Sequence, residues 1–266
     1  MNILERNNIH IHGNENAEQT IVFGHGFGTD QTSFYPVMKA FENDYKIVLF
    51  DNVGGGKSDP KAFSQQRYST LQGYVADLVD IFKELNLQNV IYIGQSVNGM
   101  VGLLTSIKHP GFFSKIITLG ASPRYLNDKG NNYHGGFEQD DLDHLYQTMT
   151  SNYVAWASGF SSMVMANADR PHLAQNFAKS LSAIRPDMAL QVAKAIFQSD
   201  YRSELNKVTV PVLIVQTTKD VAVPENVGNF MNEQIPGSKI IKVNIEGHFP
   251  HISAPEEVVD AIKSFI

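Results

Sequence analysis

The chain has 266 residues, 42% of them hydrophobic, a net charge of −6 and no cysteine. The length suits one large α/β domain or one domain that carries an insertion, and the hydrophobic content is that of a globular protein. The lack of cysteine excludes disulfides, cysteine nucleophiles and zinc–thiolate or iron–sulfur sites, and the acidic balance argues against nucleic acid as a partner.

No segment of the sequence is predicted to enter or cross a membrane. The polar N-terminal stretch has no apolar centre of the kind found in signal peptides. No run of about 18 apolar residues, the length of a membrane span, occurs along the chain. We therefore expect a soluble, cytoplasmic protein with no membrane partner.

Six short β-branched runs predict buried parallel strands, because each is nearly continuous in apolar character. The runs are Ile21–Phe23, Ile47–Phe50, Val90–Ile93, Ile116–Leu119, Val212–Val215 and Ile240–Val243. Amphipathic helices are predicted between them, including one from Thr70 to Leu85, capped by Ser69 or Thr70, and a last one from Pro255 to Phe265. This alternation predicts a doubly wound, mostly parallel sheet.

Residues 124–198 break this alternation, because they contain no strand-like run and show helical patterns dense in aromatic residues. We predict a core made of residues 1–123 and 199–266. Residues 124–198 would form a helical cap over the carboxyl edge of the sheet, where open α/β sheets bind ligands. An independent helical domain is the alternative, which we favour less because the strand pattern resumes at Val210.

The segment from Val90 to Gly99 reads VIYIGQSVNG, a strand that runs into Gly-Gln-Ser and then into a helix. This setting is typical of a nucleophile elbow, in which a strained turn lifts the hydroxyl of Ser96 above the sheet. Gly94 fits the pattern, whereas Asn98 stands where glycine is usual, and asparagine tolerates positive φ better than most residues. A serine that only caps the helix is the alternative.

A glycine-rich turn, His25 to Gly28, directly follows the first predicted strand. The backbone N–H of Phe27, together with that of Val97, would form an oxyanion hole. The alternative is an ordinary turn between strand and helix, where glycines are common. We interpret His25 itself as a hydrogen-bonded strut rather than a catalyst.

A carboxylate and an imidazole follow the last two predicted strands. Asp220 lies in the loop before Pro224, and His248 follows a glycine just after the final strand. Asp220 could instead cap its loop or the next helix, and His248 could form a metal pair with His251. We disfavour the metal pair because the loop supplies no third ligand, and we predict no metal and no cofactor.

The chain order Ser96, Asp220, His248 is that of α/β-hydrolases and differs from that of chymotrypsin and subtilisin. His248 would take the proton of Ser96 and return it to the leaving group, and Asp220 would orient the imidazole. The predicted reaction is acyl transfer to water.

The segment from Val53 to Ser58, Val-Gly-Gly-Gly-Lys-Ser, looks like a phosphate-binding P-loop. That motif needs a glycine where Asp51 stands. We therefore interpret these glycines as a tight turn after a strand.

Further motifs occur in order along the chain, and several of them lie in the predicted cap. They are His25-Gly-Phe-Gly-Thr-Asp-Gln31, the elbow at Ser96, Ser122-Pro-Arg-Tyr-Leu-Asn-Asp128, Tyr133-His-Gly-Gly-Phe-Glu138, Asn152-Tyr153 with Trp156, Arg185-Pro-Asp187, Gln216-Thr-Thr-Lys-Asp220, and Glu246-Gly-His-Phe-Pro-His-Ile-Ser-Ala-Pro255. In these motifs the chain resembles the α/β-hydrolases that include the bacterial stress-response regulator RsbQ and the plant strigolactone and karrikin receptors. The resemblance covers nearly the whole chain.

The resemblance implies an α/β-hydrolase fold with a V-shaped four-helix cap over a closed apolar pocket. Carried over, it assigns catalysis to Ser96, Asp220 and His248, and the oxyanion hole to Phe27 and Val97. The aromatic residues that would line the pocket are Phe27, Tyr125, Phe137, Trp156, Phe160 and Phe197. Such a pocket suits a small apolar ester, lactone or butenolide, although some of these aromatics would simply form the core of the cap.

Two residues beside the serine depart from the family pattern: Gln95 replaces the usual histidine, and Asn98 replaces serine or glycine. The leading hypothesis is a serine hydrolase, to which the resemblance adds a signalling role. The alternative is a regulatory binding protein with slow hydrolysis, whose cap meets a partner such as a PAS-containing stress phosphatase. A lyase or cofactor-free peroxidase on the same fold is a third reading, which no residue specifically supports.

Overall fold

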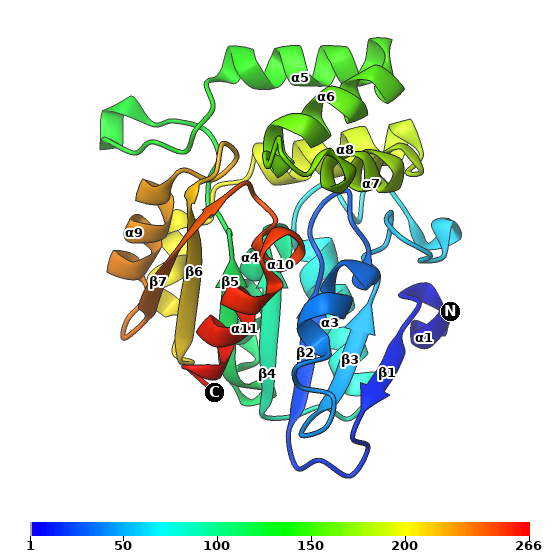
Figure 1. Ribbon diagram of the computed structural model, residues 1–266, viewed down its shortest axis with the longest axis vertical. Helices are drawn as coiled ribbons and strands as arrows, with labels where there is room; N and C mark the ends of the chain where they lie inside the picture. Colours follow the sequence, from blue (N-terminus) through cyan, green and yellow to red (C-terminus); the bar gives the residue numbers. More distant parts are fainter. Residues whose placement is uncertain (1) are drawn as a thin grey trace.

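The computed structural model describes residues 2–266 and contains one seven-stranded sheet (Figure 1). The strand order is β1-β3-β2-β4-β5-β6-β7, and every neighbouring pair is parallel except β1 with β3. The strands are β1 (His10–Gly13), β2 (Thr20–Gly24), β3 (Lys46–Phe50), β4 (Val90–Gln95), β5 (Phe113–Leu119), β6 (Val212–Lys219) and β7 (Lys239–Glu246). All six predicted runs lie within strands, and the predicted doubly wound sheet is confirmed.

Helices cover both faces of the sheet, because alternate residues of each buried strand point to opposite sides. On one side Ile21, Ile91 and Ile117 pack with α2 (Tyr35–Met38) and α11 (Pro255–Lys263). On the other side Val22, Tyr92 and Ile116 pack with α3 (Gln72–Glu84), α4 (Val97–Lys108) and α9 (Glu225–Gln234). The short elements are α1 (Ile3–Arg6), α10 (Pro250–Ser253) and five 3₁₀ turns, Gln31–Phe34, Pro60–Ala62, Pro110–Phe112, Lys129–Asn131 and Arg202–Lys207.

The predicted helix from Thr70 to Leu85 is α3, although it begins two residues later. Leu71 occupies the N-cap position and makes no side-chain cap bond. The hydroxyl of Thr70 instead accepts a hydrogen bond from the N–H of Gln72 at 3.3 Å, so it still satisfies one free amide of the first turn.

Four helices form a separate layer above the carboxyl ends of the strands (Figure 1). They are α5 (Gln139–Ser151), α6 (Tyr153–Met165), α7 (Pro171–Ser182) and α8 (Pro186–Phe197), and we call them the helical layer. The chain enters this layer after β5 and leaves it before β6. The two crossing segments are joined by a β-bridge between Arg124 and Asp200 and by their ion pair at 2.7 Å.

The sheet reverses its winding direction between β2 and β4. The chain proceeds from β2 outward to β3 on one side, and from β4 outward to β5 on the other. Such a switch point opens a crevice at the carboxyl ends of the two strands, which is where doubly wound sheets place their ligands. Across residues 2–266, no helix has the length and apolarity that a bilayer crossing requires.

Candidate active site

Ser96, His248 and Asp220 meet at the carboxyl edge of the sheet and form a continuous hydrogen-bonded row. The Nε2 atom of His248 lies 2.9 Å from the Oγ atom of Ser96, and Nδ1 lies 2.7 Å from Oδ2 of Asp220. All three residues are buried, with 6% of the surface of each exposed. The three stretches that the sequence places after separate strands therefore converge within hydrogen-bond reach.

The backbone at Ser96 has the strained geometry of a nucleophile elbow. Its φ is 53° and its ψ is −120°, a conformation that serine rarely adopts. A Cβ atom on Gly94 would collide with the backbone of Asn98, so β4 can turn sharply into α4 only with glycine at that position. The N–H of Ser96 donates to the carbonyl of Leu119 on β5 at 2.8 Å, which holds the turn against the neighbouring strand.

The sequence-based reason for tolerating Asn98 is wrong. Asn98 lies within the first turn of α4 and is not among the residues with positive φ. The positive φ belongs to Ser96 itself. Asn98 fits for a different, steric reason: the side chain packs against Gly24, which has no Cβ atom.

Asp220 both holds its own loop and faces the imidazole. Its Oδ1 atom accepts hydrogen bonds from the N–H groups of Ala222 and Val223, at 2.8 and 3.0 Å. Its Oδ2 atom is left for His248. Loop capping and orientation of the histidine, which the sequence leaves as alternatives, are thus performed by different oxygens of one carboxylate.

The backbone of His248 is held from two sides. Its N–H donates to the carbonyl of Val164 at 2.8 Å, one of the carbonyls that the end of α6 leaves without a helical partner. Its own carbonyl accepts from Nε2 of Gln95 at 3.1 Å. Gln95 therefore links the residue before Ser96 to the loop that carries the imidazole, and α6 fixes the same loop from above.

Two backbone amides beside Ser96 are free to bind an anion. Within residues 2–266, neither Phe27 nor Val97 donates its N–H to a backbone or side-chain acceptor. Val97 is the first residue of α4, where the helix dipole also favours negative charge. The ring of His25 donates from Nδ1 to the carbonyl of Gly26 at 2.8 Å and accepts at Nε2 from the N–H of Asn52, so it is a strut.

A small enclosed cavity lies directly against Ser96 and His248. Its volume is about 20 Å³, which is room for about one water molecule. The other lining residues are Phe27, Tyr125, Phe160, Val164, Ile196, Phe197, Ala222 and Phe249. A ligand larger than water therefore does not fit beside Ser96 with the lining side chains in these positions.

Four of the six aromatics expected in the pocket line this cavity, and Phe137 and Trp156 do not. The Phe137 ring packs on Phe197 with centroids 5.6 Å apart, and Trp156 stacks on Phe160 at 5.2 Å. Both lie one layer behind the lining and support it. The resemblance implied that these rings belong to the aromatic interior, but the packing of the rings determines which of them reach the cavity.

Tyr125 is closer to the reacting atoms than its expected role as a lining aromatic requires. Its hydroxyl lies 3.4 Å from Oγ of Ser96. Burial raises the pKa of Tyr125 well above its usual value, so the phenol stays protonated and keeps a donor beside the serine.

The second histidine of the loop has a different environment. The ring of His251 stacks on Phe34 with centroids 4.5 Å apart, and its nitrogens have no hydrogen-bond partner. Desolvation, followed by the charges of His248 and His25, lowers the pKa of His251 to about 3. Among the described residues, no group of three or more histidine, aspartate, glutamate or cysteine side chains is arranged to hold a metal ion.

Comparison with known proteins places this geometry in context. A family model described as "alpha/beta hydrolase fold" matches residues 19–255. The karrikin insensitive 2 receptor CA of Petunia hybrida is 44% identical over 98% of this chain and 96% of its own, and the strigolactone esterase RMS3 of Pisum sativum is 42% identical over 98% and 97%. The structure of a hydrolase from Oleispira antarctica superposes with a TM-score of 0.95 at 36% identity, covering 99% of this chain and 96% of that one.

Proposed function

Because the chain belongs to the alpha/beta hydrolase fold family, we propose that it is a serine hydrolase that cleaves small apolar esters or lactones at Ser96. The observation that carries the proposal is the row of hydrogen bonds from Ser96 through His248 to Asp220. A serine hydroxyl is a poor nucleophile near neutral pH and needs a base at this distance.

The contacts of the row define the role of each member. His248 Nε2 removes the proton as Oγ of Ser96 bonds to the carbonyl carbon, and Asp220 stabilises the imidazolium that forms. The amides of Phe27 and Val97 bind the developing oxyanion. His248 then protonates the leaving alkoxide, and an acyl-serine remains. A water molecule then attacks this ester while His248 takes its proton. His248 returns that proton to Oγ of Ser96 as the acid leaves, which restores the free serine.

The surroundings of Ser96 favour a compact, uncharged substrate. The cavity lining is almost entirely aromatic or aliphatic, and no Lys or Arg faces it to pair with an anionic substrate. We propose that residues 124–198 act as a cap that excludes water and admits an ester, lactone or butenolide when its side chains shift. Two relatives are named as a strigolactone esterase and a karrikin receptor, which fits ligands of this size and polarity.

Hydrolysis of p-nitrophenyl acetate by the wild type and by Ser96→Ala tests the proposal. We expect the turnover number to fall at least about 10³-fold, because the acyl acceptor is lost while binding contacts remain. Ser106→Ala is the matched control, since this buried serine of α4 donates only within its own helix. Wild-type turnover by Ser96→Ala would remove Ser96 as the nucleophile.

A second candidate function is signalling through a protein partner, with hydrolysis as a slow switch. It is favoured by the similarity to a protein named as the karrikin insensitive 2 receptor CA, and α6 offers Val154, at 67% exposure, as an apolar contact for a partner. The proposed partner is a PAS-containing phosphatase that binds the helical layer. Ligand-dependent capture of such a phosphatase by the wild type, lost in Val154→Asp, would support this function; rapid multiple turnover with no capture would oppose it.

A further inference from the structure

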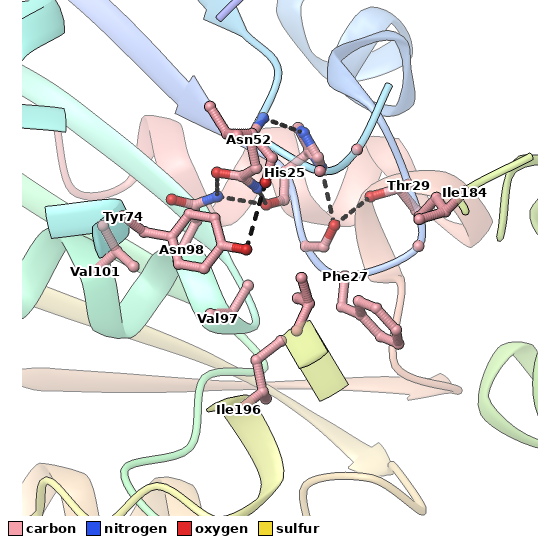
Figure 2. Close-up of a pocket in the computed structure, with 16 residues that line it drawn as sticks. His25, Phe27, Thr29, Asn52, Tyr74, Val97, Asn98, Val101, Ile184 and Ile196 are labelled. Atoms are coloured by element: carbon pink, nitrogen blue, oxygen red, sulfur yellow. Dashed lines mark hydrogen bonds between the residues drawn. The ribbon is translucent and has the colours of Figure 1, made fainter. Parts of the chain in front are cut away.

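Asn98, the departure from the family pattern two residues after Ser96, makes more contacts than its position in α4 requires. The side chain is buried, with 1% of the residue exposed, and the amide donates two hydrogen bonds and accepts one. Its Nδ2 atom donates to the carbonyl of His25 at 2.5 Å and to Oδ1 of Asn52 at 2.9 Å. Its Oδ1 atom accepts from the hydroxyl of Tyr92 at 3.0 Å. Figure 2 shows Asn98, Asn52 and His25 of this group close to Val97.

The fold makes room for this amide at one specific place. A Cβ atom on Gly24, the last residue of β2, would lie only 2.8 Å from Cγ and 2.9 Å from Cβ of Asn98. The asparagine therefore bridges the start of α4 and the end of β2. Of the expected oxyanion donors, Val97 is the first residue of α4, and Phe27 lies in the turn that follows β2.

The carbonyl of His25, which accepts a hydrogen bond from Asn98, is part of the turn from His25 to Gly28, which we call the oxyanion loop. The carbonyl of His25 belongs to the first peptide of this loop and accepts from both Asn98 and Asn52. The next peptide joins the carbonyl of Gly26 to the N–H of Phe27. That carbonyl accepts from His25 Nδ1 at 2.8 Å and from the hydroxyl of Thr29 at 3.1 Å.

These bonds determine where the N–H of Phe27 points. In a planar trans peptide the N–H and C=O directions are opposite, so a carbonyl held by two donors fixes the direction of the amide on the other side. Asn98 and Asn52 hold the first peptide, and His25 and Thr29 hold the second. Among the hydrogen bonds of residues 2–266, those of Asn98 connect this series to α4, which carries the N–H of Val97.

We propose that Asn98 is a positioning residue that sets the distance between the two oxyanion donors, Phe27 N–H and Val97 N–H. The inference rests on the function proposed above. It gives the departure from serine or glycine a role in transition-state stabilisation, because donors act on an oxyanion only when they are held in place before charge develops.

The test uses Asn98→Leu, which preserves side-chain size and removes both donated bonds. We expect kcat for p-nitrophenyl acetate to fall by about 10- to 100-fold, less than or equal to the effect of deleting one oxyanion donor, with KM changed less than about threefold. A trifluoromethyl ketone, which Ser96 attacks to form a hemiketal oxyanion, should bind more weakly in proportion. Ser106→Ala, matched for burial on the same helix, should keep wild-type values.

Asn52→Ala gives a second measurement if Asn98→Leu does not fold. It removes the other donor to the carbonyl of His25 and the acceptor of one Asn98 bond but keeps the bond from Asn98 to His25, so we expect a smaller fall in kcat, about 3- to 10-fold, with a proportionate weakening of the ketone. The inference is overturned if the folded variant matches the wild type in both kcat and ketone affinity while Ser96→Ala is inactive. Activity retained by Ser96→Ala would instead overturn the proposed function.

Discussion

The two sides of the cavity are built from different interactions. At the strand edge, Ser96, His248 and Asp220 are each fixed by directional hydrogen bonds of 2.7 to 2.9 Å. In the helical layer, a series of stacked rings leads to the cavity lining: Tyr153 stacks on Trp156 with centroids 5.5 Å apart, and Trp156 stacks on Phe160 at 5.2 Å. Hydrogen bonds lose strength quickly when atoms shift, whereas ring stacking tolerates displacement. The strand edge is therefore suited to chemistry and the helical layer to admission of a ligand.

The largest effect is expected from a substitution at the strand edge that keeps the shape of the side chain. In Asp220→Asn, the amide oxygen can keep the bonds from Ala222 and Val223, and the NH₂ group then faces Nδ1 of His248. The imidazole must accept that bond, so its proton moves to Nε2, where it cannot receive the proton of Ser96. We expect kcat to fall by about 10⁴-fold with unchanged melting temperature.

Steady-state kinetics and thermal unfolding of this variant would be measured beside Asp140→Asn, an exposed carboxylate of α5. A loss of less than tenfold in Asp220→Asn would show that orientation of the imidazole does not depend on the carboxylate.

A second test concerns His251, the buried histidine that follows His248 in the same loop. The unfolded imidazole of His251 has a pKa near 6.5 and the folded one about 3, so the unfolded state binds more protons between these values. Stability is therefore fully present above pH 6.5 and is lost as the pH falls towards 3. We expect the free energy of unfolding to drop by about 2 kcal/mol between pH 6.5 and 5 on account of this group.

Urea unfolding at several pH values would measure this contribution in the wild type, His251→Leu and an exposed control, His144→Gln on α5. Only His251→Leu should lose that part of the pH dependence. Parallel stability curves for the wild type and His251→Leu would contradict the prediction.

The smallest effect is expected in the helical layer. Phe160→Ala enlarges the cavity against Ser96 but leaves the strand edge intact, so kcat for a small acetyl ester should change less than about tenfold. Esters with a longer acyl chain should gain in kcat/KM relative to acetyl. Val154→Ala, on the exposed side of α6, should leave this chain-length preference unchanged. If Phe160→Ala also left it unchanged, the helical layer would have no role in selecting the substrate.

The sequence predicts the strands and the meeting of the three polar residues for a clear physical reason. Parallel strands end at one edge, so Ser96, Asp220 and His248 need only follow their strands to come together. The exact depth of Trp156 depends on how helices of the layer pack on one another, and that of Phe137 on its bridge to Leu126, neither of which local periodicity contains. The same limit applies to Ile196 and Ala222, whose aliphatic side chains carry no chemical signal for the site.

Asn98 shows a further kind of limit. Its acceptability depends on Gly24, on another strand, and neither residue alone indicates the contact. The sequence of the elbow alone shows an unusual asparagine, whereas the structure shows that its amide is hydrogen-bonded to Tyr92 and to His25.

The lack of a side chain on Gly24 also limits which substitutions the elbow can accept. A methyl group at position 24 would lie well inside van der Waals contact of both the hydroxyl of Tyr92 and the side chain of Asn98, which are hydrogen-bonded to each other. An alanine at the end of β2 would therefore push both partners of this bond away, and position 24 is coupled to two other elements through one missing methyl group.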